Sequence, residues 1–339
     1  MLSGRHSRRV LFVSVLALAM LATGRLEEPA LLGRSFLAQA SPAPGPGAAD
    51  EAPPVDPPAG VADGEVGEVA VVPPGDDLVE VAAAPAAPPP PELEAIAGTT
   101  PGDGTWAVVV GTDDYPGSRY DLGSAVADAG DVDAALARFG VPAGHRLVLR
   151  DRQASAATLR AAVDWLVANA GPDAVAVFFY AGHVRKLGPT TEALVGADGG
   201  LVPDAELAGR LSGLQARRMW VGIAGCYGGG FTELLAPGRV LTAAAGADDL
   251  AYENDRLGRS YLVEYMVRRG MLLDLAPATV QTAFLFAQTE ITRDFPRRIP
   301  IMVDLLGAGL DLRQGTAAPP LPAVAGPLPA PSAPAPPGG

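Results

Sequence analysis

The sequence predicts an α/β fold, a three-layer sandwich with a mostly parallel sheet of about six strands. Between residues 105 and 315, short apolar runs rich in β-branched residues alternate with segments in which apolar residues recur at helical spacing. Strands that are separated by helices pair in parallel through right-handed crossovers, which places helices on both faces of the sheet. Proline marks the limits of this body, because 15 of the 34 prolines fall between Ser41 and Pro101 and nine more follow Gly315.

Six apolar runs are expected to be the strands. The first ends at Gly111, and the third is the most apolar of the body, which is typical of a central strand buried on both faces. In chain order the runs are 106–110, 146–149, 174–180, 219–224, 239–243 and 299–303.

Helical periodicity places a helix in most of the intervals between these runs. Ser155 is an expected N-cap, and the helix that follows it stops at Gly171, next to Pro172. The other predicted helices are 122–139, 204–211, 259–267 and 278–291.

The chain divides into four parts. Residues 1–40 carry basic residues, then the apolar run 10–22, and are predicted to be an export signal or an N-terminal anchor. Residues 41–104 are predicted to be a disordered acidic Pro/Ala-rich linker that acts as a spacer, 105–315 the folded domain, and 316–339 a disordered Pro/Ala-rich tail. We therefore expect an exported, extracytoplasmic or secreted protein, with anchoring in the membrane as the alternative if the first segment is not cleaved.

The formal charge of −13 belongs mostly to the linker, because residues 35–104 hold 12 acidic and no basic residues. The folded body is close to neutral. It lacks the basic footprint of a nucleic-acid-binding protein, and no such partner is expected.

Two residues of the body could carry chemistry. His183 follows the strand that ends at Tyr180, and Cys226 follows the strand that ends near Ala224. Sites in parallel sheets form at the carboxyl ends of the strands, so both residues should project from the same edge. An imidazole beside a thiol can draw off its proton, and the thiolate attacks carbonyl carbon. Because Cys226 is the only cysteine, it excludes an internal disulfide and a multi-cysteine zinc site.

Four segments together resemble the caspase-like cysteine peptidases, nearest to the metacaspases and their bacterial relatives. The segments are WAVVVGTDDYPG at 106–117, LGSAVADA at 122–129, FFYAGHV at 178–184 and IAGCYGGGF at 223–231. The resemblance implies a caspase-like sheet of about six strands and hydrolysis of peptide bonds through an acyl-enzyme. It also implies that Cys226 is the nucleophile, that His183 is the general base, and that a peptide or protein is the substrate.

The resemblance further implies an oxyanion hole and a substrate pocket. The oxyanion hole would use the backbone N–H groups of Cys226 and Val184, although the family normally has glycine at the second position. In the pocket Asp128 matches one acid of the family, whereas Ala224 replaces another, which argues against strict specificity for basic residues. The alternative function is a catalytically impaired pseudo-peptidase that serves as a binding or scaffold domain.

No cofactor and no metal are predicted. Some metacaspases require calcium, which leaves calcium open, and Asp198, Asp204 and Glu206 are the acids that could coordinate it. They lack the regular loop spacing of a calcium site.

Overall fold

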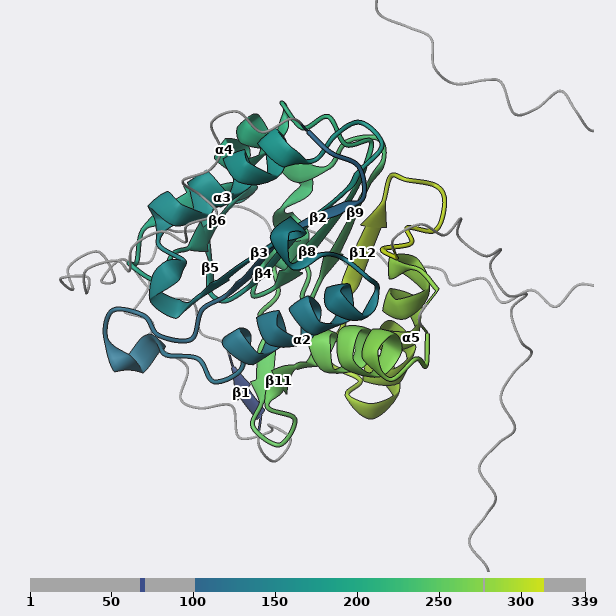
Figure 1. Cartoon of the computed structure of the whole chain (residues 1–339). Helices are drawn as coiled ribbons and strands as arrows, with labels where there is room; N and C mark the ends of the chain where they lie inside the picture. Colours follow the sequence, from purple (N-terminus) through teal and green to yellow (C-terminus); the bar gives the residue numbers. More distant parts are fainter. Residues whose placement is uncertain (1–67, 71–100, 277, 314–339) are drawn as a thin grey trace, which may run out of the picture. The chain divides into compact units, whose positions relative to one another are not determined.

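A six-stranded sheet forms the centre of the domain (Figure 1). The computed structural model describes residues 68–70, 101–276 and 278–313. Five strands are parallel, and one edge strand runs antiparallel to its neighbour. In sheet order the strands are β12 (Ile301–Asp304), β9 (Arg239–Ala243), β8 (Arg218–Ala224), β4 (Val175–Ala181), β2 (Thr105–Gly111) and β3 (Arg146–Arg150). The predicted fold class is confirmed.

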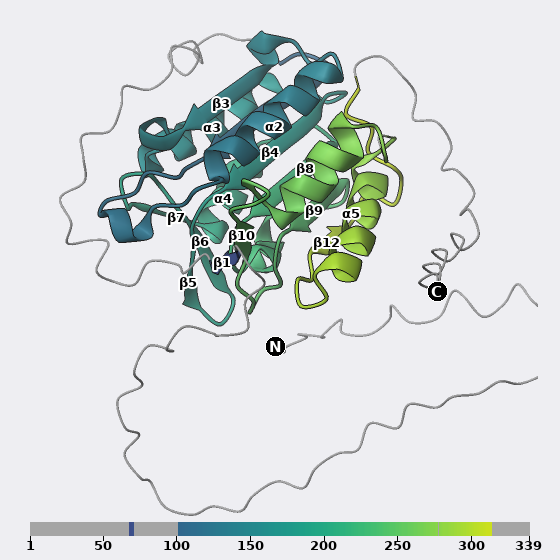
Figure 2. The ribbon, with the colours of Figure 1, turned by 90° about the horizontal axis from the view of Figure 1, so that it is seen from below.

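The helices cover both faces of this sheet. On one face lie α3 (Ala156–Asn169) and α4 (Asp204–Leu211), and on the other α2 (Ala125–Arg138) and α5 (Val280–Asp294) (Figure 2). Each face encloses its own apolar cluster, because successive residues of β4 point alternately to the two sides. All seven residues of β4 are buried, as expected of a central strand.

Ser155 caps α3 as predicted, and its side chain accepts a hydrogen bond from the N–H of Thr158. The helix predicted over 259–267 is different. Arg259–Ser260 form the short strand β11, and the helix begins later as a π-helix, η7 (Val263–Leu272). The N–H of Ser260 donates to the buried carboxyl of Asp128 in α2, which holds the start of this segment extended.

Two small sheets join the central one. Directly after β4, β5 (Val184–Gly188), β6 (Thr191–Val195) and β7 (Leu201–Pro203) form an antiparallel sheet that the sequence pattern does not predict. The other sheet has the order β1 (Glu68–Ala70), β10 (Tyr252–Asn254) and β11. Strand β1 lies inside the range predicted to be an unstructured linker.

The domain begins slightly earlier than predicted, because Gly102 forms an isolated bridge with Ala170. The predicted export signal or anchor, most of the predicted linker and the C-terminal tail lie outside the described residues. Within the described residues, no helix is both long enough and apolar enough to span a membrane.

Candidate active site

His183 and Cys226 follow adjacent parallel strands at the same height. Ala181 at the end of β4 is in register with Ala224 at the end of β8, and each reactive residue comes two positions later. The backbones remain in contact beyond the strands, because the N–H of Gly182 donates to Ala224 O at 3.4 Å. A Cβ built on Gly225 would lie 2.6 Å from the carbonyl oxygen of Gly182. The structure therefore brings the two predicted residues to one edge of the sheet.

The imidazole of His183 has one engaged and one unengaged nitrogen. Its Nε2 lies 2.8 Å from the carbonyl oxygen of Tyr120. A carbonyl can only accept, so this nitrogen carries the proton and Nδ1 carries the lone pair of the neutral ring. Nδ1 is buried and has no hydrogen-bond partner among the described residues. The backbone thus selects the tautomer in which Nδ1 is the basic atom.

Two tyrosine hydroxyls fix the backbone of His183. Its N–H donates to the hydroxyl of Tyr115 at 2.9 Å, and the hydroxyl of Tyr180 donates to its carbonyl oxygen at 2.7 Å. Gly182 between them has φ +151°, and a Cβ there would lie 2.6 Å from the Tyr115 hydroxyl. Only glycine fits this position, which explains the glycine of the Ala-Gly-His segment.

Cys226 lies in an apolar environment. Its side chain is fully buried and packs with Ala245 and Ala251. The N–H of Ala251 donates to Sγ at 3.3 Å. Directly after the cysteine, Tyr227 adopts a left-handed conformation with φ 54°, so the chain turns sharply behind the thiol. The sulfur is thus presented at the start of a turn.

Burial shifts the pKa of both groups towards the neutral form. The pKa of His183 falls from 6.5 to about 4, mainly because burial penalises the imidazolium, while the hydrogen bond to Tyr120 opposes the shift. The pKa of Cys226 rises from 9.0 to about 11, again mainly through burial, which the backbone N–H of Ala251 partly offsets. At neutral pH the resting pair is a thiol and a neutral imidazole.

Val184 and Ala224, the two departures from the family pattern, are both buried. Val184 is fully buried within the apolar cluster on the α3 side of the sheet, and its Cγ2 would lie 3.1 Å from a Cβ at Gly225. Ala224 packs into the cluster on the other side and is 8% exposed. The β-branched side chain of Val184 is therefore part of the core.

The carboxyl of Asp128 is also buried, with 1% exposure. Both of its oxygens accept from the N–H of Ser260, at 3.1 and 3.3 Å. Its pKa is raised well above 3.8, first because of burial. The structure shows Asp128 as a link between α2 and β11, and its predicted contact with substrate stays a prediction.

Some groups of this site have no signature in the sequence. The carbonyl of Tyr120 and the N–H of Ala251 are backbone atoms, which every residue has. The carboxylate of Glu253 is a side-chain group, but the sequence pattern does not single it out. This carboxylate accepts from the N–H groups of Gly123 and Ser124 and from the Ser124 hydroxyl, at 3.0, 3.1 and 2.6 Å. Glu253 thereby ties β10 to the turn before α2.

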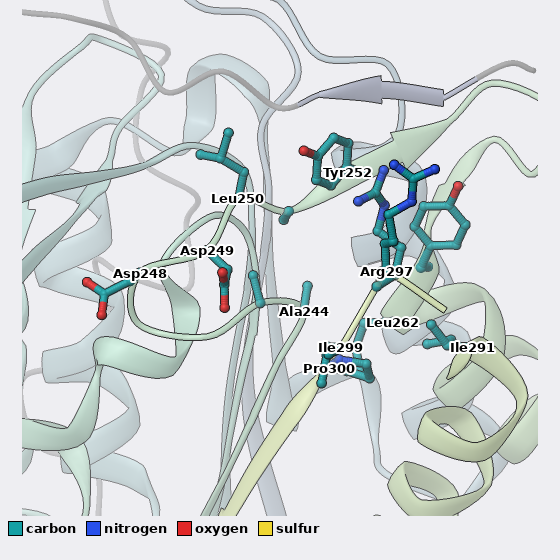
Figure 3. Close-up of a pocket in the computed structure, with 14 residues that line it drawn as sticks. Ala244, Asp248, Asp249, Leu250, Tyr252, Leu262, Ile291, Arg297, Ile299 and Pro300 are labelled. Carbon is teal, nitrogen blue, oxygen red and sulfur yellow. The ribbon is translucent and has the colours of Figure 1, made fainter. Parts of the chain in front are cut away.

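A cavity of about 340 Å³ lies next to the apolar residues that surround Cys226. It lies between the loop 244–252 and the turn 297–300 (Figure 3). Ala245 and Ala251 line the cavity and also contact Cys226. Asp248 and Asp249 lie at one end and Arg297 at the other (Figure 3). At that second end, the guanidinium of Arg298 lies over the Tyr252 ring, 3.5 Å from its centroid. The cavity is mixed in character, with opposite charges at its two ends.

The acids considered for calcium are engaged elsewhere. Asp198 accepts from the N–H groups of Ala156 and Gly200, and Asp204 accepts from those of Glu192 and Ala205. Glu206 binds two arginines, Arg160 and Arg210. Over residues 68–70, 101–276 and 278–313, no three His, Cys, Asp or Glu side chains are grouped so that they could hold a metal ion. The donors present do not fit a calcium site.

The fold and the site define a class of protein: an α/β sandwich with a histidine and a cysteine at the carboxyl ends of adjacent central strands. Comparison with known families agrees, because residues 105–220 match the model of the caspase domain, Peptidase C14. Residues 105–220 are therefore similar to the caspase-like family of cysteine peptidases, in agreement with the resemblance of the four sequence segments. The matched segment contains His183 and ends before Cys226.

Other comparisons add little. No curated protein matches the chain. Among solved structures, the crystal structure of protein GSU0716 from Geobacter sulfurreducens aligns with a TM-score of 0.49 and 16% identity. The alignment covers 64% of this chain and 100% of that one. The metacaspase type stays a prediction from the sequence.

Proposed function

We propose that the protein is a cysteine endopeptidase in which Cys226 is the nucleophile and His183 the general base. The observation that carries the proposal is the hydrogen bond from His183 Nε2 to Tyr120 O, with Nδ1 left as the basic atom at the edge where Cys226 lies. A general base needs an available lone pair within reach of the proton that it removes. The backbone supplies that lone pair by fixing the tautomer.

The reaction starts from a neutral pair. Because the pKa of Cys226 is about 11 and that of His183 about 4, the thiol is protonated when substrate arrives. His183 Nδ1 takes the proton as Sγ attacks the peptide carbonyl, and the N–H groups of Cys226 and Val184 stabilise the oxyanion. The imidazolium then gives its proton to the leaving amine, which leaves a thioester. Water, deprotonated by the same nitrogen, hydrolyses the thioester and restores the thiol.

The test is turnover of a peptide library by the full chain and its Cys226→Ala variant. We expect Cys226→Ala to abolish both turnover and labelling by a peptidyl electrophile. His145→Gln serves as a control, because His145 stacks on Trp106 near the amino end of β2, with ring centroids 3.7 Å apart. The candidate site lies at the opposite, carboxyl ends of the strands. Undiminished turnover in Cys226→Ala would contradict the proposal.

One observation favours a second function. Complete burial and the raised pKa of Cys226 keep the thiolate scarce, as in a structural cysteine. A pseudo-peptidase would bind peptide or partner without cleaving any member of the library, and its binding would survive Cys226→Ala. Turnover of even one library peptide by the parent chain, lost in Cys226→Ala, decides for the enzyme.

We also propose that the protein is exported. The support is the basic and apolar composition of residues 1–40, which lie outside the described part of the chain. Sequencing the N-terminus of the chain recovered from cell fractions tests this. A new N-terminus within residues 1–40, in an extracytoplasmic fraction, supports export with cleavage. An intact N-terminus in the membrane fraction supports the anchored alternative, and an intact N-terminus in the cytoplasm contradicts both.

A further inference from the structure

Lys186 is the only lysine among the 25 basic residues of the chain, and all the others are arginines. It lies in β5, three residues after His183. An ammonium group is compact and has three donors that can point at acceptors in different directions, whereas a guanidinium is a planar fork. The contacts of Lys186 use this property.

The ammonium of Lys186 joins the hairpin of β5 and β6 to the loop 244–252. Its Nζ donates to the carbonyl oxygen of Ala247 at 2.8 Å and to the carboxylate of Asp248. It also lies 5.7 Å from the centroid of the Tyr227 ring, within the usual range of a cation–π contact. One ammonium therefore contacts both the loop that packs on the thiol and the residue that directly follows the cysteine.

Glu192 holds this ammonium from the side of the hairpin. It lies opposite Lys186 in the register of β5 and β6, and its Oε1 is 3.6 Å from Nζ. The carboxylate of Glu192 is buried, and neither oxygen has a hydrogen-bond partner among the described residues. Burial raises the pKa of Glu192, whereas the positive charge of Lys186 opposes this shift. A buried carboxylate of this kind needs a nearby cation, so Glu192 fixes where the ammonium lies.

The loop 244–252 reaches from Lys186 to the thiol. Ala251 donates its N–H to Sγ at 3.3 Å, and this bond lowers the pKa of the thiol against the larger effect of burial. A second tie comes from Tyr227, whose N–H donates to the carbonyl oxygen of Asp249 at 2.9 Å. The conformation of the loop therefore determines where the N–H of Ala251 points, and Lys186 restrains that conformation.

We propose that Lys186 is a positioning residue for the proposed nucleophile: its ammonium holds the loop 244–252 in the conformation in which the N–H of Ala251 reaches Cys226 Sγ. Lys186 acts through this loop and is not itself a catalytic residue. The consequence for turnover rests on the peptidase proposal, whereas the effect on the loop does not.

The test compares the full chain with its variants Lys186→Met, Asp248→Asn and the combination of the two. Lys186→Met removes the charge and its donors. Asp248→Asn removes only a charge on the surface and leaves the pair of Lys186 with Glu192 in place, so it still reports if Lys186→Met does not fold. Asp255→Asn is the matched control, because Asp255 is an exposed acid in the turn after β10.

The first measurement is hydrogen exchange of the Ala251 amide, with the amides of β4 as the internal reference. Lys186→Met should speed exchange at Ala251 by about tenfold, since a hydrogen bond from a charged donor is lost, and Asp248→Asn should speed it by less. The double variant should equal Lys186→Met, because Asp248 acts on the loop through that ammonium. The amides of β4, and all amides of the Asp255→Asn control, should exchange as in the parent chain.

The second measurement is the kinetics of the best library peptide. In Lys186→Met we expect kcat to fall by about tenfold while KM stays within about twofold, because the nucleophile is misplaced and peptide binding is not.

Equal exchange of the Ala251 amide in Lys186→Met, Asp248→Asn and the control would overturn the proposal. An equal acceleration at β4 would also overturn it, because the change would then be general unfolding. Faster exchange at Ala251 with unchanged kcat would show that the loop does not position the nucleophile. A parent chain without turnover contradicts the peptidase proposal alone, and the exchange result still decides whether Lys186 holds the loop.

Discussion

The segments that follow β4 and β8 hold their reactive side chains by different means. After β4, hydrogen bonds with Tyr115, Tyr120 and Tyr180 fix both the backbone and the ring of His183. After β8, Cys226 is held by apolar contacts and by a hydrogen bond from the N–H of Ala251 at 3.3 Å. The ring proposed as the base is therefore held in one orientation, whereas burial keeps the proposed nucleophile neutral, and the proposed mechanism activates it only when substrate binds.

The largest effect is expected at the base itself. His183→Gln can keep a donor for Tyr120 O but has no basic nitrogen, so kcat/KM should fall by about 10² to 10⁴, the usual contribution of general base catalysis. Kinetics on the best library peptide measure it. The thiol should still react with iodoacetamide at high pH in this variant, and unchanged kcat/KM would remove His183 from the mechanism.

Gly182→Ala disturbs the two tyrosine hydroxyls that hold the backbone of His183, and leaves the imidazole ring itself unchanged. The new Cβ would meet the hydroxyls of Tyr115 and Tyr180 at 2.6 and 2.8 Å, at a φ that L-residues avoid. We expect a loss of about 3 kcal/mol in the free energy of unfolding, measured with urea. Gly209→Ala is the control, since a Cβ there meets nothing within 4 Å and alanine favours its helix α4. A loss no greater in Gly182→Ala than in the control would show that the side chains of Tyr115 and Tyr180 move aside at little cost.

Acid should weaken the folded state through the same histidine. The unfolded chain takes up a proton at His183 near pH 6.5, but the folded chain does so only near pH 4. The unfolded state therefore binds more protons in this window, and stability falls as the pH drops from about 6.5 to about 4, by about 3 kcal/mol in total. Urea unfolding at several pH values measures the slope. His183→Gln should flatten it, and an unchanged slope in that variant would place the proton uptake elsewhere.

Tyr115→Phe should have a smaller effect. Without the hydroxyl, the buried N–H of His183 loses its acceptor, at a cost of about 1 to 2 kcal/mol in unfolding free energy. Nε2 keeps its bond to Tyr120 O, so kcat/KM should fall far less than in His183→Gln. A fall as large as in His183→Gln would mean that the ring position depends on this one hydroxyl.

The smallest effect is expected from pH on the rate of the proposed reaction. With the two pKa values near 4 and 11, the protonation state of the free pair does not change between them. We expect kcat/KM to vary by less than about threefold from pH 6 to pH 9. A bell-shaped profile with a maximum inside that range would instead indicate a preformed thiolate–imidazolium pair.

Local patterns were sufficient for much of the fold. The bounds of α4 and β9 agree with the prediction, because Asp204 and Leu211, and Arg239 and Ala243, coincide with changes in composition. The edge shared by His183 and Cys226 could be predicted because each residue directly follows a strand of a parallel sheet. What the sequence could not provide depends on distant partners: β1 exists only through β10, and the carbonyl of Tyr120 has no side-chain signature. Residues 259–260 were misread as helix because their extended form depends on Asp128.

The covalent tether of β1 also sets a concentration scale. A strand that is tethered to the strand with which it pairs typically acts at an effective concentration on the order of millimolar. A free peptide of equal intrinsic affinity for β10 would then need to reach about that concentration to occupy half of the molecules. Peptides that bind at micromolar concentration would have to owe their advantage to contacts beyond the β10 ladder. The cavity of about 340 Å³ beside Tyr252 is the part of the surface where such contacts are available.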